Sequence, residues 1–302
     1  MPYPSPVTYP SPNLYPGFAA DGSGLKLSIG DLVLGDVDPF GVEWTVAKFD
    51  GWTGSPAPTL RLTQRARGHG ATGSESYLQP RVMTVEGLIK APSQDALEDA
   101  FDRLDAAITL DQTQMVVGQS SKVRNAMVQR QGEVIPEYLT DTLGRYSALI
   151  VAKDPLKYGD LVTASTLLPS SSGGLVYPVT YPITYTGVTN SGVIRVNNLG
   201  NTQAPVWLRI DGPIPAGGWT VTHIGKKQSL TFAVSLALAA GEFVTVDMSR
   251  REVLAQGQSA RAGYVTSRGW FTLDPGDNDI AFSAQNFSAT AQLTVTTKPA
   301  WS

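Results

Sequence analysis

The sequence contains no cysteine, and only two histidines occur among its 302 residues. The lack of cysteine excludes disulfide scaffolds, thiolate metal sites and thiol nucleophiles, and it leaves the redox compartment open. Charged residues are also scarce, at 16% of the chain, and the net charge is −3. This charge balance does not point to nucleic acid or to an acidic membrane. A surface with few charges is typical of proteins that partners cover in an assembly.

Long hydrophobic runs are missing as well. The longest run, FAVSLALAAG from Phe232, is too short to span a bilayer. The first residues, MPYPSPVTYPSPNLYPGF, lack the charged region and the apolar core of a signal peptide. We therefore expect no membrane insertion, and synthesis in a cytoplasm.

The residue patterns of common enzymes do not occur. His69 lies in RGHGATG, where a solvated loop histidine is expected, and no HExxH, GxSxG or Walker lysine is present. Glu133 and Glu137 in EVIPEY are a pair of acids that we expect in a solvated loop. We predict no enzyme activity, no cofactor and no metal site. A cell-wall glycoside hydrolase on a β scaffold stays open as a third reading.

One segment, residues 92–110, has the periodicity of an amphipathic helix, which we place at about 93–109. Ser93 after Pro92 is a good N-cap. The apolar stripe consists of Leu97, Phe101, Leu104 and Ile108. The opposite face is acidic and carries Glu98, Asp99, Asp102 and Asp105. Asp99 and Arg103 have the i, i+4 spacing of a helix ion pair. The pattern predicts a helix laid on a sheet with an acidic outer face.

Most other segments alternate apolar and polar residues, which favours β-strands. In the first half these are residues 25–29, 42–46, 60–62, 81–89 and 145–152. A glycine-rich stretch, residues 68–76, indicates the tip of a long hairpin or loop. After residue 192, about eight short strand patterns recur with turn residues between them, as in a sandwich or jelly roll.

Two segments stand apart from these strands by composition. Residues 1–20 alternate tyrosine and proline, which favours an extended arm. Residues 161–192 are rich in Ser, Thr, Gly, Pro and Tyr, and we expect them to connect two domains with some extended pairing.

The stretch WFTLDPGDNDIAF, residues 270–282, brings several oxygen-bearing side chains together. It lacks the spacing of an EF-hand, so a calcium site is not favoured. Two strands, WFTL and DIAF, would flank a turn in which proline presets φ and glycine takes a positive φ. We assign a structural turn to Asp274, Pro275, Gly276 and Asn278.

Aromatic residues raise the question of ligand binding. Trp207 and Trp270 lie in strand patterns and are expected in the core. Trp219 follows PAGG and is the better exposed candidate for a ligand or partner contact, with His223 a few residues later. An ordinary histidine at a strand end is the simpler interpretation of His223. A carbohydrate-binding module is therefore the alternative function.

Several motifs resemble, in sequence order, those of siphophage distal tail proteins. Residues 85–108 are similar to the strand, connection and helix of the family's ring-forming domain, and residues 149–159 to the exit from it. Residues 197–214 resemble the entry into the second domain, and residues 238–253 resemble its Gly-Glu strand pair. The family's closing pattern is matched by Trp270, Leu273, Pro275, Gly276, Asn278, Ile280 and Phe282.

The resemblance implies a mainly β fold with two domains. Residues 21–157 would be a β-sandwich-type ring domain that carries the helix, and residues 193–302 a galectin-like jelly-roll or β-sandwich domain. Residues 158–192 would connect them. The arm at residues 1–20 departs from the family's compact opening, and we expect a neighbouring subunit to order it. The short glycine-rich tip leaves the size of the family's protruding belt open.

The resemblance also implies a structural virion protein at the distal end of a long non-contractile tail, synthesised in the host cytoplasm. Six copies would form a closed ring, or hub, that joins the tail tube to the tail-tip or baseplate apparatus and leaves a channel for DNA. The implied partners are the tail-tube protein, the tail-associated hub protein, and receptor-binding proteins or a host glycan for attachment. DNA would be only a passing cargo. We expect Asp99, Asp102 and Asp105 to face the channel, because like charge prevents DNA from adhering.

Overall fold

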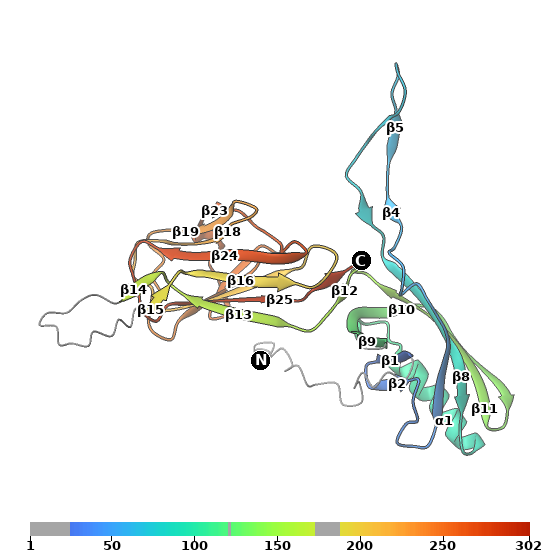
Figure 1. The fold of residues 1–302 in the computed structure, drawn as a ribbon. Helices are drawn as coiled ribbons and strands as arrows, with labels where there is room; N and C mark the ends of the chain where they lie inside the picture. Colours follow the sequence, from blue (N-terminus) through green and yellow to red (C-terminus); the bar gives the residue numbers. More distant parts are fainter. Residues whose placement is uncertain (1–24, 120–121, 173–187) are drawn as a thin grey trace, which may run out of the picture. The chain divides into compact units, whose positions relative to one another are not determined.

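The computed structural model describes residues 25–119, 122–172 and 188–302, which form two compact units (Figure 1). The N-terminal unit holds the described residues up to 159, together with residues 301–302, and the C-terminal unit holds the described residues from 160 to 300. The Tyr/Pro arm predicted at residues 1–20 lies outside the described residues. Within the described ranges, no helix has the length and hydrophobicity needed to cross a membrane.

Antiparallel strands build the N-terminal unit in the order β2-β1-β9-β10-β11-β8-β3, and β12 pairs with β10. The bounds are β1 (Leu25–Ile29), β2 (Leu32–Leu34), β3 (Glu43–Asp50), β8 (Arg81–Lys90), β9 (Thr113–Gln119), β10 (Lys122–Thr140), β11 (Leu143–Ala152) and β12 (Lys157–Tyr158). The first part of β10, residues 122–128, pairs with β9, and the second part, residues 129–140, pairs with β11. This strand therefore joins the two halves of the sheet.

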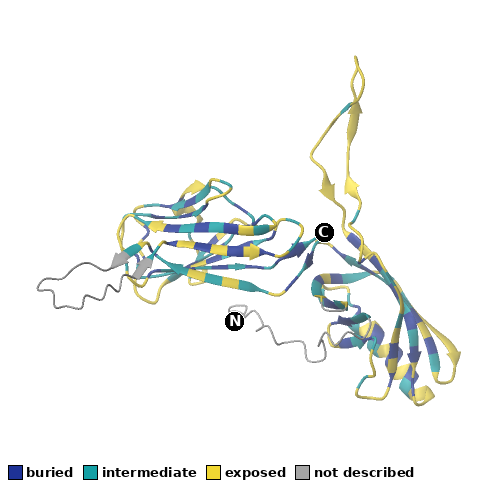
Figure 2. Ribbon diagram, in the orientation of Figure 1, coloured by how far each residue is buried: buried dark blue, intermediate teal, exposed yellow. Residues whose placement is uncertain are grey.

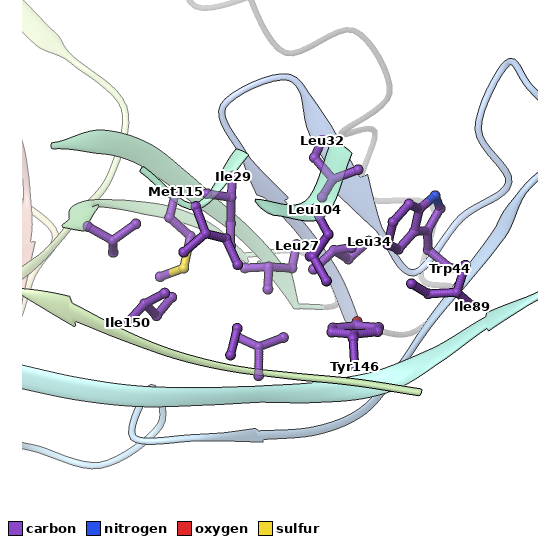
Figure 3. Packing of buried hydrophobic residues seen from close by; sticks show 14 of the residues in the cluster. Leu27, Ile29, Leu32, Leu34, Trp44, Ile89, Leu104, Met115, Tyr146 and Ile150 are labelled. Atoms are coloured by element: carbon purple, nitrogen blue, oxygen red, sulfur yellow. The ribbon is translucent and has the colours of Figure 1, made fainter. Parts of the chain in front are cut away.

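The two halves enclose one hydrophobic core (Figure 3). Leu27 and Leu34 come from the half that contains β1 and β2, and Ile89 and Tyr146 come from the half that contains β8 and β11. All four side chains are at most 1% exposed. Strands β8 and β11 alternate buried positions with more exposed ones, which is the period-2 pattern of a sheet with one face in a core.

The predicted helix is confirmed as α1 (Gln94–Ala107). The Ser93 hydroxyl oxygen accepts a hydrogen bond from the Ala96 amide at 3.2 Å, as an N-cap should. The apolar stripe packs on the sheet, where a Cβ at Gly144 would lie 2.6 Å from the Phe101 ring. Position 144 therefore needs a glycine for the helix to approach the sheet. The Arg103 guanidinium bonds Asp38 instead of the expected Asp99 carboxylate, because Asp38 offers a half-buried acceptor at 2.7 Å.

The prediction of a loop around Glu133 and Glu137 is wrong. Both residues lie in β10, exposed to solvent, and Glu137 is paired in register with Arg145 of β11. Register shifts after Arg130 and near Tyr138 interrupt the strand. These irregularities break the period-2 pattern, so the strand is not visible in the sequence.

The C-terminal unit is an antiparallel sandwich of two main sheets, ordered β13-β25-β17-β20-β21-β22 and β16-β24-β18-β19-β23. The first sheet consists of β13 (Val162–Leu167), β17 (Val206–Asp211), β20 (Phe243–Asp247), β21 (Glu252–Ala255), β22 (Ser259–Ala260) and β25 (Gln292–Thr297). The second consists of β16 (Val193–Asn198), β18 (Trp219–His223), β19 (Gln228–Phe232), β23 (Val265–Arg268) and β24 (Gly276–Ala284). The smaller elements of this unit are β14 (Ser170–Ser172), β15 (Val188–Asn190) and η1 (Ala262–Tyr264). The last strand, β26 (Ala300–Trp301), is divided between the two units.

Two expectations for this unit differ from the structure. Residues 162–167 of the predicted connecting segment form β13, which pairs with β25 along its whole length. Residues 270–273 do not form the strand expected from WFTL, and only Leu273 makes a bridge, to Ala204. The fold class predicted from the sequence is nevertheless confirmed, because the described residues are mainly β, with one amphipathic helix among them and a C-terminal sandwich.

Candidate functional site

The acidic stretch at residues 270–282 contains a turn that the Asn278 side chain holds together. Asn278 Nδ2 donates to the carbonyl oxygens of Asp274 at 2.8 Å and Gly276 at 2.9 Å, and Asn278 Oδ1 accepts from the Asp274 amide at 3.0 Å. Gly276 has φ +90°, a conformation that favours glycine. Asn278 is itself 3% exposed. The order of Pro275, Gly276 and Asn278 in the sequence therefore builds a tight entry into β24.

The three carboxylates of this stretch point to different cations. Asp274 forms an ion pair with Lys226 at 2.8 Å. Asp279 accepts two hydrogen bonds from Arg195, at 2.8 and 3.0 Å, and this pairing lowers the pKa of Asp279. Asp277 lies 3.9 Å from the same guanidinium. The carboxylates do not converge on one point, and across the described residues no cluster of three or more His, Asp or Glu side chains could hold a metal ion.

His223 is part of the interior of the C-terminal unit, at the end of β18. It is 3% exposed, which fits the ordinary strand-end histidine that the sequence favoured and argues against the alternative, an exposed contact with a ligand or partner. His223 Nε2 lies 3.0 Å from Asn278 Oδ1, and His223 Nδ1 accepts from the Lys226 amide at 3.3 Å. Because Nδ1 accepts and the Asn278 oxygen cannot donate, the neutral ring carries its proton on Nε2. Burial lowers the pKa of His223, and nearby Lys226 adds to this effect.

The exposure expected of the tryptophans is reversed in the structure. Trp219 is 1% exposed and stacks on Phe232 with ring centroids 3.7 Å apart, so it is a core residue and not a ligand contact. Trp207 is only half-buried, and its Nε1 donates to Asp247 at 3.0 Å. Trp270 is also half-buried. The alternation of side chains along a strand could have shown this difference. Trp207 lies on the same face of its strand as the charged Arg209, whereas Trp219 lies on the same face as the apolar Val221.

A long hairpin projects from the N-terminal unit between β3 and β8 (Figure 1). Its strands are β4 (Pro58–Thr59), β5 (Leu62–Gln64), β6 (Ala71–Gly73) and β7 (Tyr77–Leu78), paired β4 with β7 and β5 with β6. We call residues 53–80 the projecting hairpin. Nearly all of it is exposed (Figure 2), including the large apolar side chains Leu60, Leu62, Tyr77 and Leu78. The hairpin predicted around the glycine-rich tip is confirmed.

Arg81 fixes the root of the projecting hairpin. Its guanidinium Nη1 donates to the carbonyl oxygens of Gly51, Trp52 and Gly54 at 2.6 to 3.0 Å, and its Nε donates to that of Pro155 at 2.9 Å. Arg81 is 1% exposed. Four carbonyl groups from two segments are therefore held by one buried side chain.

A second buried cation, Lys157, lies beside Arg81. Its Nζ donates to the Trp52 carbonyl oxygen at 3.2 Å and lies 5.8 Å from the Trp52 ring centroid. Burial lowers the pKa of Lys157 to about 8, and the positive charges of Arg81 and Arg124 contribute. Sequence reasoning missed both cations. The position of Arg81 was visible, however, because it shares the parity of Met83 and Val85 in the alternating strand β8.

The helix acids Asp99, Asp102 and Asp105 are all exposed on the outer face of α1. Asp105 forms an ion pair with Arg130 at 2.8 Å. Asp102 and Glu98 contribute to raising the pKa of Tyr138, after the effect of burial. The outer face of α1 therefore carries exposed carboxylates. That Asp99, Asp102 and Asp105 face the channel of an assembly stays a prediction.

Comparisons with known proteins give the class. Residues 199–301 match the model of the siphovirus-type tail component, C-terminal domain, named SPP1_Dit. A search of curated protein sequences finds no relative of this chain. The chain is similar in structure to the Dit protein of phage SPP1, whose crystal structure is described as a paradigm of the hub adsorption apparatus in phages that infect Gram-positive bacteria. The match covers 91% of this chain and 98% of the SPP1 chain. The TM-score is 0.65 at 12% sequence identity.

Two structures of the phage p2 baseplate in its activated conformation are weaker likenesses. With calcium the TM-score is 0.48 at 10% identity, and with strontium it is 0.47 at 11% identity. Both cover 90% of this chain and 97% of the matched chain. At these TM-scores the two structures add no argument to the comparison.

Residues 199–301 therefore match the C-terminal domain of siphovirus-type tail components, and the fold of the chain is similar to that of the SPP1 Dit protein. The SPP1 likeness extends the same architecture over the N-terminal unit, at an identity that supports the fold alone. The family match lies in residues 199–301. The resemblance to siphophage distal tail proteins is thus confirmed, and these proteins are structural tail components and not a family of enzymes.

Proposed function

We propose that this protein forms a closed ring, of six copies by analogy with its relatives, at the distal end of a long non-contractile tail. The observation that carries the proposal is the match of residues 199–301 to a tail component domain, on a chain whose overall fold follows a tail hub protein. The ring would join the tail-tube protein on one face to the tail-associated hub protein and receptor-binding apparatus on the other. The protein would act as a scaffold in the virion, without catalytic turnover, after synthesis in the host cytoplasm.

The projecting hairpin supports an assembly of this kind. An isolated two-stranded hairpin is marginally stable in water. Here Leu60, Leu62 and Tyr77 are 53%, 62% and 68% exposed, so the hairpin leaves apolar surface that a partner would cover. In a ring, each copy presents one surface to the next copy and a different surface to the previous one. A hairpin that lies on the neighbouring copy would fit this head-to-tail arrangement.

The channel of the ring is proposed to be acidic where it meets DNA. The exposed carboxylates of Asp99, Asp102 and Asp105 on α1 are candidates for this wall. A negatively charged wall repels phosphate and would let DNA pass without binding.

The carbohydrate-binding alternative relied on an exposed Trp219 near His223. Both side chains are buried, at 1% and 3% exposure. In the part of the chain that the structure describes, no observation therefore favours this alternative over the tail ring.

The proposal is tested by light scattering on the full-length protein over a concentration series. We expect a species with the mass of about six chains. In the double variant Leu60→Asp with Leu62→Asp, assembly would bury two unpaired carboxylates at the covered surface. Because burying unpaired charges is costly, the large species should disappear. The matched control, Ser74→Asp with Gln79→Asp, changes exposed polar residues of the same hairpin and should leave the mass unchanged. A monomer at every concentration that also fails to add to purified tail tubes would contradict the proposal.

A further inference from the structure

An apolar groove runs along the edge strand β2 of the N-terminal unit. It has a volume of about 600 Å³ and lies between the β1–β2 turn, the segment after β2, and the last turn of α1. Its apolar lining includes Leu32, Val33, Val37, Phe40, Ala106 and Ala107. Phe40 is 69% exposed and Val37 is 58% exposed. We call this site the β2 groove.

The charged groups of the β2 groove are already paired with one another. Asp38 Oδ2 accepts from Trp44 Nε1 at 3.0 Å and from Arg103 Nη1 at 2.7 Å, while Asp38 Oδ1 accepts from the amides of Phe40 and Val42. Burial on its own raises the pKa of Asp38, but these hydrogen bonds outweigh it and hold the pKa below its usual value. An ionic ligand would find no unmatched charge at Asp38 or Arg103. The groove is therefore suited to an uncharged, apolar occupant.

An aromatic platform completes the groove. The Arg103 guanidinium lies 4.5 Å from the centre of the Phe40 ring. One face of this ring is therefore supported by a fixed cation, and the side chain remains mostly exposed. Aromatic-lined grooves are the sites that bind proline-rich segments, because a proline ring packs flat on an aromatic face. Asp31 and Asp36 add carboxylate oxygens to the lining, which can accept from hydroxyl groups.

The chain enters the N-terminal unit at the rim of this groove. Leu27 pairs with Leu34, so the antiparallel register places Leu25 beside Asp36, which lines the groove. Lys26 Nζ bonds Asp36 Oδ2 at 3.0 Å, and a Cβ at Gly35 would lie 2.6 Å from the Leu25 carbonyl oxygen. Whatever precedes Leu25 therefore starts next to the groove.

The segment that precedes Leu25 is a hexad repeat. It reads YPSPVT, YPSPNL, YPGF, so that a Tyr-Pro pair recurs at residues 3, 9 and 15. No charged residue occurs in residues 1–20. Polyproline II has about three residues per turn, so a period of six places the three tyrosines on one face of such a helix. Such a segment presents apolar rings, hydroxyl donors and little entropy to lose on binding.

We propose that the β2 groove is the docking site for the Tyr/Pro arm of the same chain, with the Tyr15-Pro16 pair as the anchor. The pyrrolidine ring would pack on Phe40, and the tyrosine hydroxyl would donate to a rim carboxylate. This differs from the expectation that a neighbouring subunit orders the arm, and it does not depend on the ring. Residues 19–24, AADGSG, provide a short polar tether.

The tether length favours the same chain over a neighbour. Tyr15 is ten residues before Leu25, and a glycine-containing linker of ten residues spans about 17 Å on average, which is enough to fold back from Leu25 into an adjacent groove. A short tether of this kind gives an effective concentration in the millimolar range. Weak contacts are then sufficient to keep the arm bound, without a new interface between copies.

The test uses the full-length protein with the photoreactive residue p-benzoylphenylalanine in place of Tyr15. After irradiation, mass spectrometry locates the crosslinks. We expect them at groove residues, within residues 31–40 and 103–113, in the same chain as the probe. A variant that fills the groove, Ala106→Arg, should lower the yield by about tenfold or more, the factor expected for the loss of 1.4 kcal/mol or more of affinity. The control Gln94→Arg adds the same side chain at an exposed position of α1 outside the groove.

Mixing isotopically labelled and unlabelled protein distinguishes crosslinks within one chain from crosslinks between two chains. Crosslinks that join two different chains would overturn docking in the same chain. Crosslinks spread over the surface, or a yield that Ala106→Arg leaves unchanged, would overturn the groove as the site. Circular dichroism of both arginine variants confirms that the fold is kept, so that a lost crosslink reports the groove and not unfolding.

Discussion

The side chain of Asn278 makes four hydrogen bonds from a buried position, three within its turn and one to His223. Asn278→Ala leaves three polar groups of the turn and the His223 nitrogen without this partner. We expect the free energy of unfolding of the C-terminal unit to fall by about 3 kcal/mol. Urea unfolding followed by tryptophan fluorescence measures the loss. The neighbouring change Asp277→Ala, at an exposed position, should cost less than about 1 kcal/mol. Equal losses for both variants would contradict this role.

His223 makes the stability of the same unit depend on pH. Its pKa is lowered by burial, so between pH about 6.5 and the folded pKa the unfolded chain binds a proton that the folded chain does not. The stability that this group contributes is complete above pH 6.5 and is lost as the pH falls through the folded pKa. His223→Gln should remove this dependence in urea titrations between pH 7.5 and about 5. His69→Gln is the matched control, since His69 is exposed in the projecting hairpin.

At the residue scale, the turn could be predicted from the sequence, but the burial of individual side chains could not. Pro275, Gly276 and Asn278 specify a turn through their own backbone preferences, which need no tertiary information. The burial of Trp219 depends on which face of β18 meets the second sheet. Parity with Val221 and His223 gives that answer only once the strand and the buried face are known.

The projecting hairpin depends as an element on the buried guanidinium at its root. Arg81→Leu removes the side-chain donor to the carbonyl oxygens of Gly51, Gly54 and Pro155, and leaves the Trp52 carbonyl oxygen with Lys157 alone. We expect a loss of about 3 kcal/mol in the N-terminal unit. Local opening should also make Arg61, Arg65 and Arg67 faster to cleave with trypsin. Arg145→Leu, an exposed arginine with one 3.7 Å ion pair, should change neither readout.

Elements with a regular period were the most predictable part of the fold. α1 has a 3.6-residue stripe and a capping serine, and the burial of β8 alternates without interruption. β10 and β13 were missed for different physical reasons. Register shifts break the pattern of β10, and β13 is a short edge strand whose partner, β25, lies more than a hundred residues away in sequence. Arg81 was missed because its partners are carbonyl groups, which no residue type reveals.

At the scale of the whole molecule, the proposed channel makes charge on α1 a functional property and not a stabilising one. Asp99, Asp102 and Asp105 are exposed, and the ion pair of Asp105 with Arg130 is a surface pair worth about 0–1 kcal/mol. The triple variant Asp99→Asn, Asp102→Asn, Asp105→Asn should therefore fold and assemble. Neutral walls would let phosphate approach, so that DNA passes more slowly.

The measurement is the rate of DNA release from particles that carry the triple variant. We expect several-fold slower release, with a larger effect at low salt, because screening weakens the repulsion that the acids provide. The control triple variant, Glu43→Gln, Glu133→Gln, Asp141→Asn, removes three exposed carboxylates of the same unit that lie outside α1. Equal release from wild-type and triple-variant particles would place the acidic face of α1 away from the channel. Slowing by both triple variants would mean that total charge, and not the position of the acids on α1, controls the passage of DNA.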